Sequence, residues 1–144
     1  MAERYKLSSD VQLMLIKDDK ILLLKRQNTG YMDGQYGLPA GHLESEESLV
    51  SAMIREAKEE AGLELKPEDL VFSQSMHRKS TPDYLTFFFT VENYQGPEPQ
   101  NTEPEKCSEL NWFALDNLPE NTIYWVKIGI ANYQNGIKFS EPDF

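Results

Sequence analysis

The sequence predicts an α/β fold in which a mixed β-sheet is sandwiched between helices (α/β/α), with residues 1–144 forming a single domain. Two observations predict this class. Strand-like apolar runs stand on both sides of one amphipathic helical segment, and a second helical segment follows the last of them. A chain of 144 residues, 40% of them apolar, is long enough to bury a core, and no linker, repeat or low-complexity tract divides it.

The strands are predicted from apolar runs bounded by polar turns. Residues 11–17 and 21–26 are separated by a short aspartate-containing turn, which is typical of a β-hairpin. Residues 70–77 and 84–91 predict a second hairpin, and the later of these two runs is apolar enough for a central strand. Residues 109–115 predict a further strand, which follows a proline-rich loop.

The principal helix is predicted over residues 48–61. Apolar side chains recur there at four-residue spacing and form one stripe: Leu49, Met53, Ala57 and Ala61. Ser45 is expected to cap the amino end of this helix, and Gly62 stands where a left-handed C-cap residue is expected. A second helix is predicted over residues 122–133.

Composition argues against several classes of function. The net charge of −10 opposes binding to the phosphate backbone of long nucleic acid, and no basic stretch offsets it. Cys107 is the only cysteine, which excludes an intramolecular disulfide and a cysteine-rich zinc site. No segment approaches the roughly 20 apolar residues that span a bilayer, and residues 1–10 lack the apolar stretch of a signal peptide. We therefore expect a cytoplasmic protein with no membrane partner.

Three carboxylates gather near the end of the principal helix. At about 100° per residue, Glu56, Glu59 and Glu60 fall within an arc of roughly 100°. Neighbouring carboxylates repel one another, and the helix dipole disfavours negative charge in this half of the helix. Because Ala52 stands one turn before Glu56, we expect no cationic side chain to relieve them. Such a cluster suits a hard cation such as Mg²⁺, and the ordinary alternative is a solvated acidic face.

The residues around these glutamates resemble the Nudix box. The match begins at Gly41, includes Glu47, and ends with the run Arg55-Glu56-Ala57-Lys58-Glu59-Glu60-Ala61-Gly62-Leu63. Segments on either side also look like those of the family, namely Tyr36-Gly37-Leu38-Pro39-Ala40-Gly41-His42 and Glu109-Leu110-Asn111-Trp112-Phe113. The resemblance implies the Nudix fold and the hydrolysis of a pyrophosphate bond in a nucleoside diphosphate derivative. It also implies Mg²⁺ as the cofactor, with Mn²⁺ as a substitute.

The family's roles carry over position by position. Glu59 and Glu60 match the carboxylates that ligate catalytic divalent cations. Glu56 matches a glutamate that ligates metal or acts as the general base on the attacking water. Ala40 matches a residue whose backbone carbonyl ligates metal. The resemblance therefore implies that these four residues form the catalytic metal site.

Other site residues follow from the same resemblance. Many family members supply a further metal-ligating glutamate from a downstream loop, for which Glu103 is the first candidate and Glu105 the second; an ordinary loop charge is the alternative for both. Glu47 and Arg55 match a pair that ties the loop to the helix, which gives them, like Gly41 and Gly62, a structural role. Phosphate binding is the rival role for Arg55.

The box gives the reaction class and leaves the substrate open. Because signatures of the ADP-ribose, NADH and diadenosine polyphosphate groups are missing, the nearest group by elimination is the MutT-like nucleoside triphosphate pyrophosphatases, including those that act on oxidised dNTPs. The candidate substrate-binding residues are Arg26, Tyr36, Arg78 and Tyr124, and Tyr31 and Trp125 are further aromatic residues able to stack on a base.

Several alternatives remain open. The substrate class alternatives are a nucleotide sugar and a dinucleotide. A non-catalytic nucleotide-sensing module and an isomerase on the same fold are the alternatives to a hydrolase. The expected partner is a small-molecule nucleotide, and both a monomer and a homodimer fit the sequence.

Overall fold

A computed structural model describes residues 2–144. It contains strands and helices in the following order: β1 (Ser8–Lys17), β2 (Lys20–Arg26), β3 (Tyr36–Gly37), β4 (Ala40–His42), α1 (Leu49–Ala61), the 3₁₀ helix η1 (Pro67–Asp69), β5 (Val71–Arg78), β6 (Tyr84–Val91), β7 (Cys107–Ala114), α2 (Tyr124–Gln134) and β8 (Phe139–Ser140). Both predicted hairpins are confirmed, as β1–β2 and β5–β6.

The strands form one mixed sheet. Its main path runs β3-β2-β1-β6-β5-β8, with β4 paired to β1 and β7 paired to β2. The pair β1–β6 is parallel, with Ser8 opposite Tyr84 and Leu15 opposite Val91. The pairs β1–β2, β1–β4, β2–β7 and β5–β6 are antiparallel. The prediction of an α/β fold with a mixed sheet is therefore confirmed.

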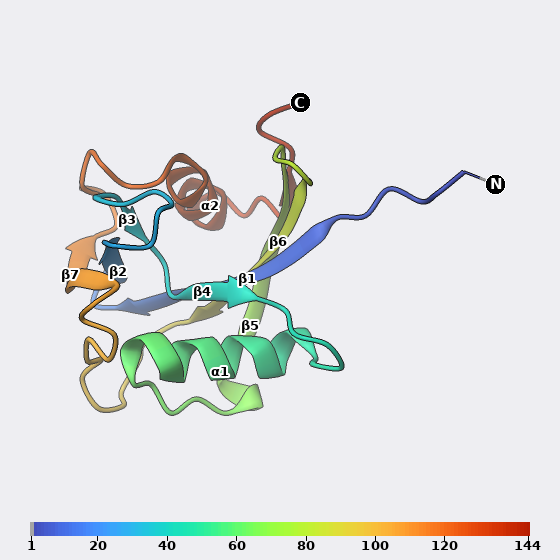
Figure 1. Ribbon diagram of the computed structural model, residues 1–144. Coiled ribbons are helices and arrows are strands. Elements are labelled where there is room, and N and C mark those ends of the chain that lie inside the picture. The colour runs from blue at the N-terminus through green and yellow to red at the C-terminus, as the bar shows by residue number, and fades with distance from the viewer. Residues whose placement is uncertain (1) are drawn as a thin grey trace.

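The two α-helices cover opposite faces of the sheet (Figure 1). Strand β1 explains why both faces need a cover, because its side chains alternate between them. Leu13 and Leu15 pack in the cluster beneath α1, whereas Met14 and Ile16 pack in the cluster beneath α2. A strand buried on both sides carries a continuous apolar run, which is why this stretch predicted a strand without showing polar alternation.

The amino ends of both helices differ from the sequence expectation. Ser48, and not Ser45, caps α1, since its side-chain oxygen accepts a hydrogen bond of 3.1 Å from the amide of Ser51. Gly62 ends α1 in the left-handed conformation at φ 65°, as expected. Helix α2 begins at Tyr124 because residues 121–123 are held extended against β3 by backbone hydrogen bonds to Tyr36.

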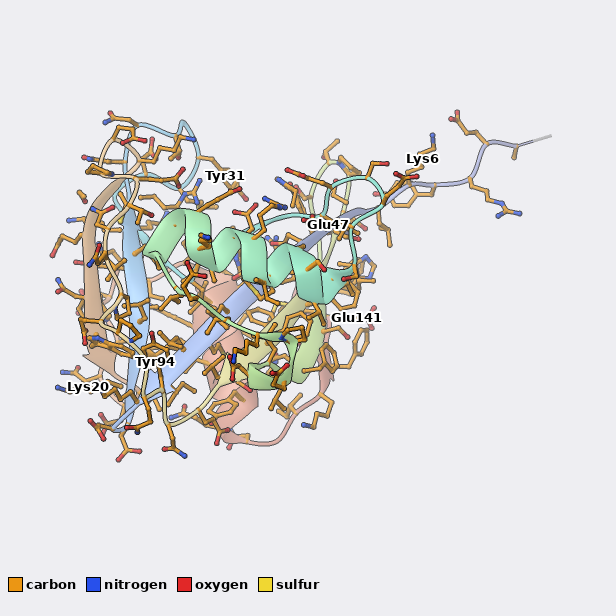
Figure 2. All side chains as sticks on the ribbon, turned by 90° about the horizontal axis from the view of Figure 1, so that it is seen from below. Lys6, Lys20, Tyr31, Glu47, Tyr94 and Glu141 are labelled. Atoms are coloured by element: carbon orange, nitrogen blue, oxygen red, sulfur yellow. The ribbon has the colours of Figure 1, made fainter. Side chains whose placement is uncertain are left out.

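Three labelled residues locate the ends of the domain in Figure 2. Lys20, at the start of β2, and Glu141, near the carboxyl end of the chain, lie far apart in Figure 2, and Lys6 lies where the N-terminal segment leaves the body of the domain. Neither helix in residues 2–144 combines the length and the apolar character needed to cross a bilayer. Residues of β1, β4, α1 and the loop before β7 meet around one cavity of about 690 Å³.

Candidate active site

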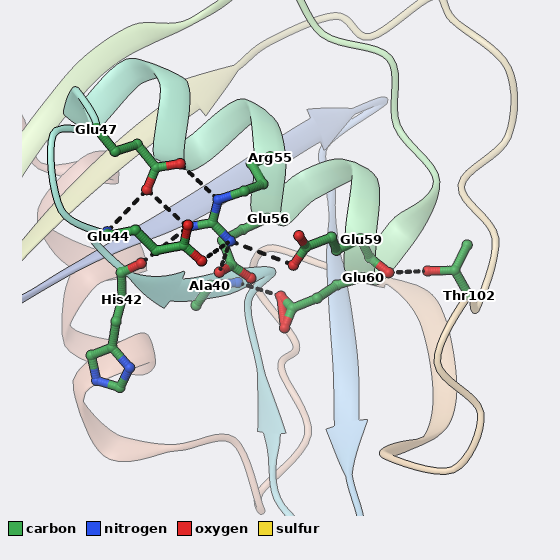
Figure 3. Close-up of polar contacts among 9 residues, drawn as sticks. All are labelled: Ala40, His42, Glu44, Glu47, Arg55, Glu56, Glu59, Glu60 and Thr102. Carbon is green, nitrogen blue, oxygen red and sulfur yellow. Dashed lines mark hydrogen bonds and ion pairs between the residues drawn. The ribbon is translucent and has the colours of Figure 1, made fainter.

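Arg55 links the loop before α1 to the carboxylates of the helix (Figure 3). Its Nε donates a hydrogen bond of 2.7 Å to Oε2 of Glu47, and its Nη2 donates one of 2.9 Å to Oε1 of the same carboxylate. Nη2 also donates to the carbonyl of His42 at 3.2 Å. This bidentate pair fixes the loop that carries β4 against α1.

The same guanidinium also contacts the predicted metal-binding face. Nη1 of Arg55 lies 2.7 Å from Oε1 of Glu56 and 3.5 Å from Oε2 of Glu59. The expectation that no cationic side chain relieves the glutamates is therefore wrong. It considered only the residue one turn before Glu56, whereas the long side chain of the adjacent arginine reaches over the same face of the helix.

Glu60 is the most deeply placed of the three carboxylates. Its Oε1 accepts a hydrogen bond of 2.7 Å from the amide of Ala40, which ties α1 to β4. Burial raises the pKa of Glu60 to about 8, and the negative charges of Glu56 and Glu103 act in the same direction. Burial also raises the pKa of Glu56, although Arg55 opposes that shift. Glu56 and Glu60 therefore lie close enough to other carboxylates, Glu103 included, for like charge to add to the effect of burial on their pKa values.

Gly41 allows the strand to approach the helix. A Cβ atom built on Gly41 would overlap the carboxylate of Glu56. The absence of a side chain at this position therefore leaves the space in which the Glu56 carboxylate lies. Gly41 shows no left-handed φ, so close approach and not backbone conformation is the reason for glycine here.

The loop that carries Glu103 is attached directly to the end of α1. The hydroxyl of Thr102 donates to the carbonyl of Glu59, and the amide of Gln100 donates to the carbonyl of Ala61 at 2.9 Å. Glu103 lines the cavity together with the three helix glutamates, whereas Glu105 is exposed and does not line it. Sequence reasoning missed the role of Thr102, because a lone threonine in a proline-rich loop carries no pattern.

The predicted substrate-binding residues divide into two groups. Arg26 and Arg78 line the cavity, as do Tyr31 and Trp125. Tyr36 does not line it, because its ring is buried edge-on against Phe113 at 5.0 Å.

Tyr124 also lies outside the cavity. It is exposed on the first turn of α2, where its hydroxyl bonds Asp143 at 3.0 Å. Neither Tyr36 nor Tyr124 lines the cavity, and a contact of either residue with substrate stays a prediction.

The donor chemistry of this corner fits a hard divalent cation. Glu56, Glu59, Glu60 and Glu103 supply carboxylate oxygens around one cavity, and such oxygens are the ligands that hard divalent cations prefer. Within residues 2–144, no three acidic, histidine or cysteine side chains already converge as a metal-ligating group. The reason is local, since Glu56 is turned toward Arg55 and Glu60 toward the amide of Ala40. Binding a cation would therefore require these side chains to turn.

Acid titration tests the link between Glu47 and Arg55. The hydrogen bonds from Arg55, and then the amide of Glu44, lower the pKa of Glu47 to about 2. A lowered carboxyl pKa stabilises the folded state above the usual value of 4.5, and this contribution is lost as the pH falls toward about 2. We expect the stability difference between the wild type and Glu47→Gln, measured by urea unfolding, to shrink over that range. The exposed Glu46→Gln is the control, and a Glu47→Gln difference independent of pH would contradict the assignment.

Comparison with known proteins identifies the family. A family model described as the NUDIX domain matches residues 7–131. The ADP-ribose pyrophosphatase of Methanocaldococcus jannaschii is 34% identical over 104 residues, which cover 72% of this chain and 60% of that protein. The NAD-capped RNA hydrolase NudC of Stutzerimonas stutzeri is 32% identical over 116 residues, which cover 79% of this chain and 39% of that protein. The chain thus spans less than two thirds of the length of these curated relatives.

A solved structure shares both the fold and part of the sequence. The MutT NUDIX hydrolase from Burkholderia pseudomallei superposes with a TM-score of 0.78 at 26% identity, over 88% of this chain and 97% of that one. The family match over residues 7–131, the box residues around α1 and the mixed sheet all indicate the same family. The chain belongs to the NUDIX domain family of hydrolases.

Proposed function

We propose that this protein hydrolyses a pyrophosphate bond in a nucleoside diphosphate derivative, and that its substrate is a nucleoside or deoxynucleoside triphosphate, released as the monophosphate and pyrophosphate. The observation that carries the proposal is the cluster of four carboxylates at one end of a cavity large enough for a nucleotide. The relatedness to a MutT NUDIX hydrolase over nearly the whole of both chains supports the triphosphate as substrate.

The residues of the site suit the steps of such a reaction. A water oxygen attacks phosphorus, an anhydride P–O bond breaks, and the water's proton goes to a carboxylate. We assign proton acceptance to Glu56, because burial raises its pKa above the ordinary value of a glutamate and Arg55 orients its carboxylate. Glu59, Glu60, Glu103 and the backbone of Ala40 would hold Mg²⁺, or Mn²⁺ in its place. The metal would supply charge neutralisation at the phosphates and a lower pKa for water.

Cationic side chains that could bind phosphate line the same cavity as the four glutamates. These side chains belong to Lys25, Arg26 and Lys106. Arg26 lies close enough to Glu60 to lower that carboxyl's pKa, which supports a role for its charge beside the carboxylates. Its guanidinium is oriented by the carbonyl of Tyr31 at 2.7 Å and the hydroxyl of Thr29 at 3.2 Å. We assign phosphate orientation to Arg26.

A second substrate class follows from the curated relatives. One is named for ADP-ribose and another for NAD-capped RNA, so both names include a nucleotide joined through a diphosphate. We keep this class as the alternative substrate for the same carboxylates. A module that binds nucleotides without cleaving them is the alternative to an enzyme, and the presence of every box glutamate speaks against it.

A substrate panel tests the proposal. Nucleoside triphosphates, ADP-ribose, NAD and nucleotide sugars would be incubated at pH 8–9 with Mg²⁺, with phosphate and pyrophosphate measured separately and EDTA as the control. Pyrophosphate released from a triphosphate is the expected result. Cleavage only of ADP-ribose or NAD would move the substrate to the alternative class. Nucleotide binding without any turnover would overturn the hydrolase assignment.

A further inference from the structure

The cavity contains a second set of residues that the proposed reaction does not use. Asp10 and Gln12 of β1 and Arg78 of β5 line it, together with the aromatic residues Tyr31 and Trp125. They come from segments far apart in the sequence and include charged and amide side chains that are almost completely buried, with Arg78 and Gln12 each only 4% exposed. Buried polar groups of this kind need hydrogen-bond partners. The hydrogen bonds present therefore show which polar atoms are left for a ligand.

The carboxylate of Asp10 organises this set. Its Oδ1 accepts a hydrogen bond of 2.6 Å from the hydroxyl of Thr86. Its Oδ2 accepts hydrogen bonds from Nε2 of Gln12 at 3.0 Å and from Nη2 of Arg78 at 3.5 Å. Arg78 is fixed further by a 2.9 Å hydrogen bond from its Nε to the Thr86 hydroxyl. The amide of Gln12 and the guanidinium of Arg78 therefore flank one carboxylate oxygen.

The orientation of these two side chains is determined by the chemistry of Asp10. An ionised carboxylate only accepts hydrogen bonds, so the amide nitrogen of Gln12 must face it and the oxygen Oε1 must point elsewhere. Neither Oε1 of Gln12 nor Nη1 of Arg78 has a hydrogen-bond partner among residues 2–144. Because no fully buried side-chain polar atom in that range lacks a partner, both atoms keep some exposed surface, and both residues line the cavity.

Aromatic rings border the same place. The Arg78 guanidinium lies 4.0 Å from the centroid of the Trp125 ring and 4.7 Å from that of Tyr84, so it is held between two rings. Tyr31 stacks near Trp125 with centroids 6.2 Å apart, and it is the exposed member of that pair at 46%. An exposed ring at the mouth of a cavity offers a face on which a planar base can stack.

We propose that this set binds the base of the nucleotide and selects bases with a lactam edge, in which a carbonyl oxygen stands next to a ring N–H. The inference rests on the proposed nucleotide hydrolysis at the other end of the cavity. Nη1 of Arg78 donates to the carbonyl, and Oε1 of Gln12 accepts from the ring N–H. Hypoxanthine, guanine, uracil and thymine present this edge, whereas adenine and cytosine present the reverse pattern and would leave buried groups unpaired.

Matched nucleotide pairs test the proposal on the unmodified protein. ITP and ATP differ chiefly in a 6-oxo against a 6-amino group, and UTP and CTP differ in the same way at position 4. We expect kcat/KM to favour ITP over ATP and UTP over CTP by about tenfold or more. Ratios near one, or a preference for ATP, would overturn the proposal.

Two variants separate edge recognition from stacking. Gln12→Leu removes the acceptor and leaves Asp10 with two partners, so we expect the ITP/ATP ratio to fall toward one through a higher KM for ITP. Tyr31→Ala removes the stacking face, so KM should rise for both nucleotides with the ratio unchanged. Tyr5→Ala, an exposed tyrosine outside the cavity, is the matched control for Tyr31→Ala. An unchanged ratio in Gln12→Leu would contradict the assignment of Gln12.

Binding without turnover distinguishes this inference from the proposed function. Calorimetric titration of the protein with IMP and with AMP, in the presence of EDTA, gives the dissociation constant of each nucleotide without catalysis. Tighter binding of IMP with no hydrolysis of any triphosphate would support the base site and reject the proposed activity. Hydrolysis of all triphosphates at equal rates, with IMP and AMP bound equally, would support the activity and reject the base site.

Discussion

Glu60→Gln is expected to lower kcat by at least about a hundredfold while the fold is retained, because the substitution removes a negative charge at the centre of the carboxylate cluster. Glutamine preserves the volume of the side chain and an oxygen that accepts the 2.7 Å hydrogen bond from Ala40. We expect a similar loss for Glu59→Gln. Glu64→Gln is the matched control, since Glu64 pairs only with Lys58 on the surface just after α1.

Although Glu60→Gln is expected to lose activity, it is expected to gain stability at alkaline pH. Burial raises the pKa of Glu60 to about 8, so the folded state favours the protonated carboxyl. Without a divalent cation, the stability of the wild type should fall as the pH rises from the usual value of 4.5 through about 8. Thermal unfolding in EDTA should therefore show Glu60→Gln to be more stable than the wild type at pH 9. Near-normal kcat, or a variant less stable at pH 6 and at pH 9, would contradict the assignment.

Gly41→Ala is expected to lower kcat by about tenfold or more with little change in the thermal midpoint. The added methyl group would occupy the space of the Glu56 carboxylate, and that flexible side chain can move aside more easily than the strand can. The loss should therefore appear in catalysis, where positions matter to a fraction of an ångström, and not in folding. Steady-state kinetics and thermal unfolding of the same preparation measure the two effects.

A double-mutant cycle supplies the control for this prediction. In a Glu56→Gln background the residual activity no longer depends on an ionised carboxylate at that position, so the further change Gly41→Ala should have a much smaller effect. An equal loss in both backgrounds would show that the methyl group acts through the backbone of β4 and not through Glu56. An unfolded Gly41→Ala protein would lead to the same conclusion.

The long elements of the fold were predictable because each carries its own local pattern. Residues 11–17 and 84–91 form strands that are mostly apolar, and α1 has its four-residue apolar stripe and its C-cap glycine. The short strands β3, β4 and β8 have two or three residues each and no such pattern. They are strands only because distant residues supply their hydrogen-bond partners, which a sequence does not show directly.

The residues of the candidate site also differ in how well local sequence patterns predict them. The three glutamates of α1, Glu56, Glu59 and Glu60, lie within little more than one turn of the helix, so their common face follows from helix geometry alone. Arg55 was misjudged because helix geometry gives the direction of a side chain at its base and not the reach of a long guanidinium. Arg78 was a candidate from the sequence, but its association with Gln12 was not predictable, since Asp10 brings the two together from different strands.

The central position of β1 has a consequence for how the domain acquires its site. Asp10 and its partner Thr86 are 76 residues apart in the chain, and β1 pairs with β6 from Ser8 opposite Tyr84 to Leu15 opposite Val91. Such non-local pairing must overcome a large loss of chain entropy before it is stabilised, which slows folding. The cavity cannot form until the chain has been synthesised through β6, and a nascent or proteolytically cut chain that ends before Tyr84 would have the box helix without the binding site it serves.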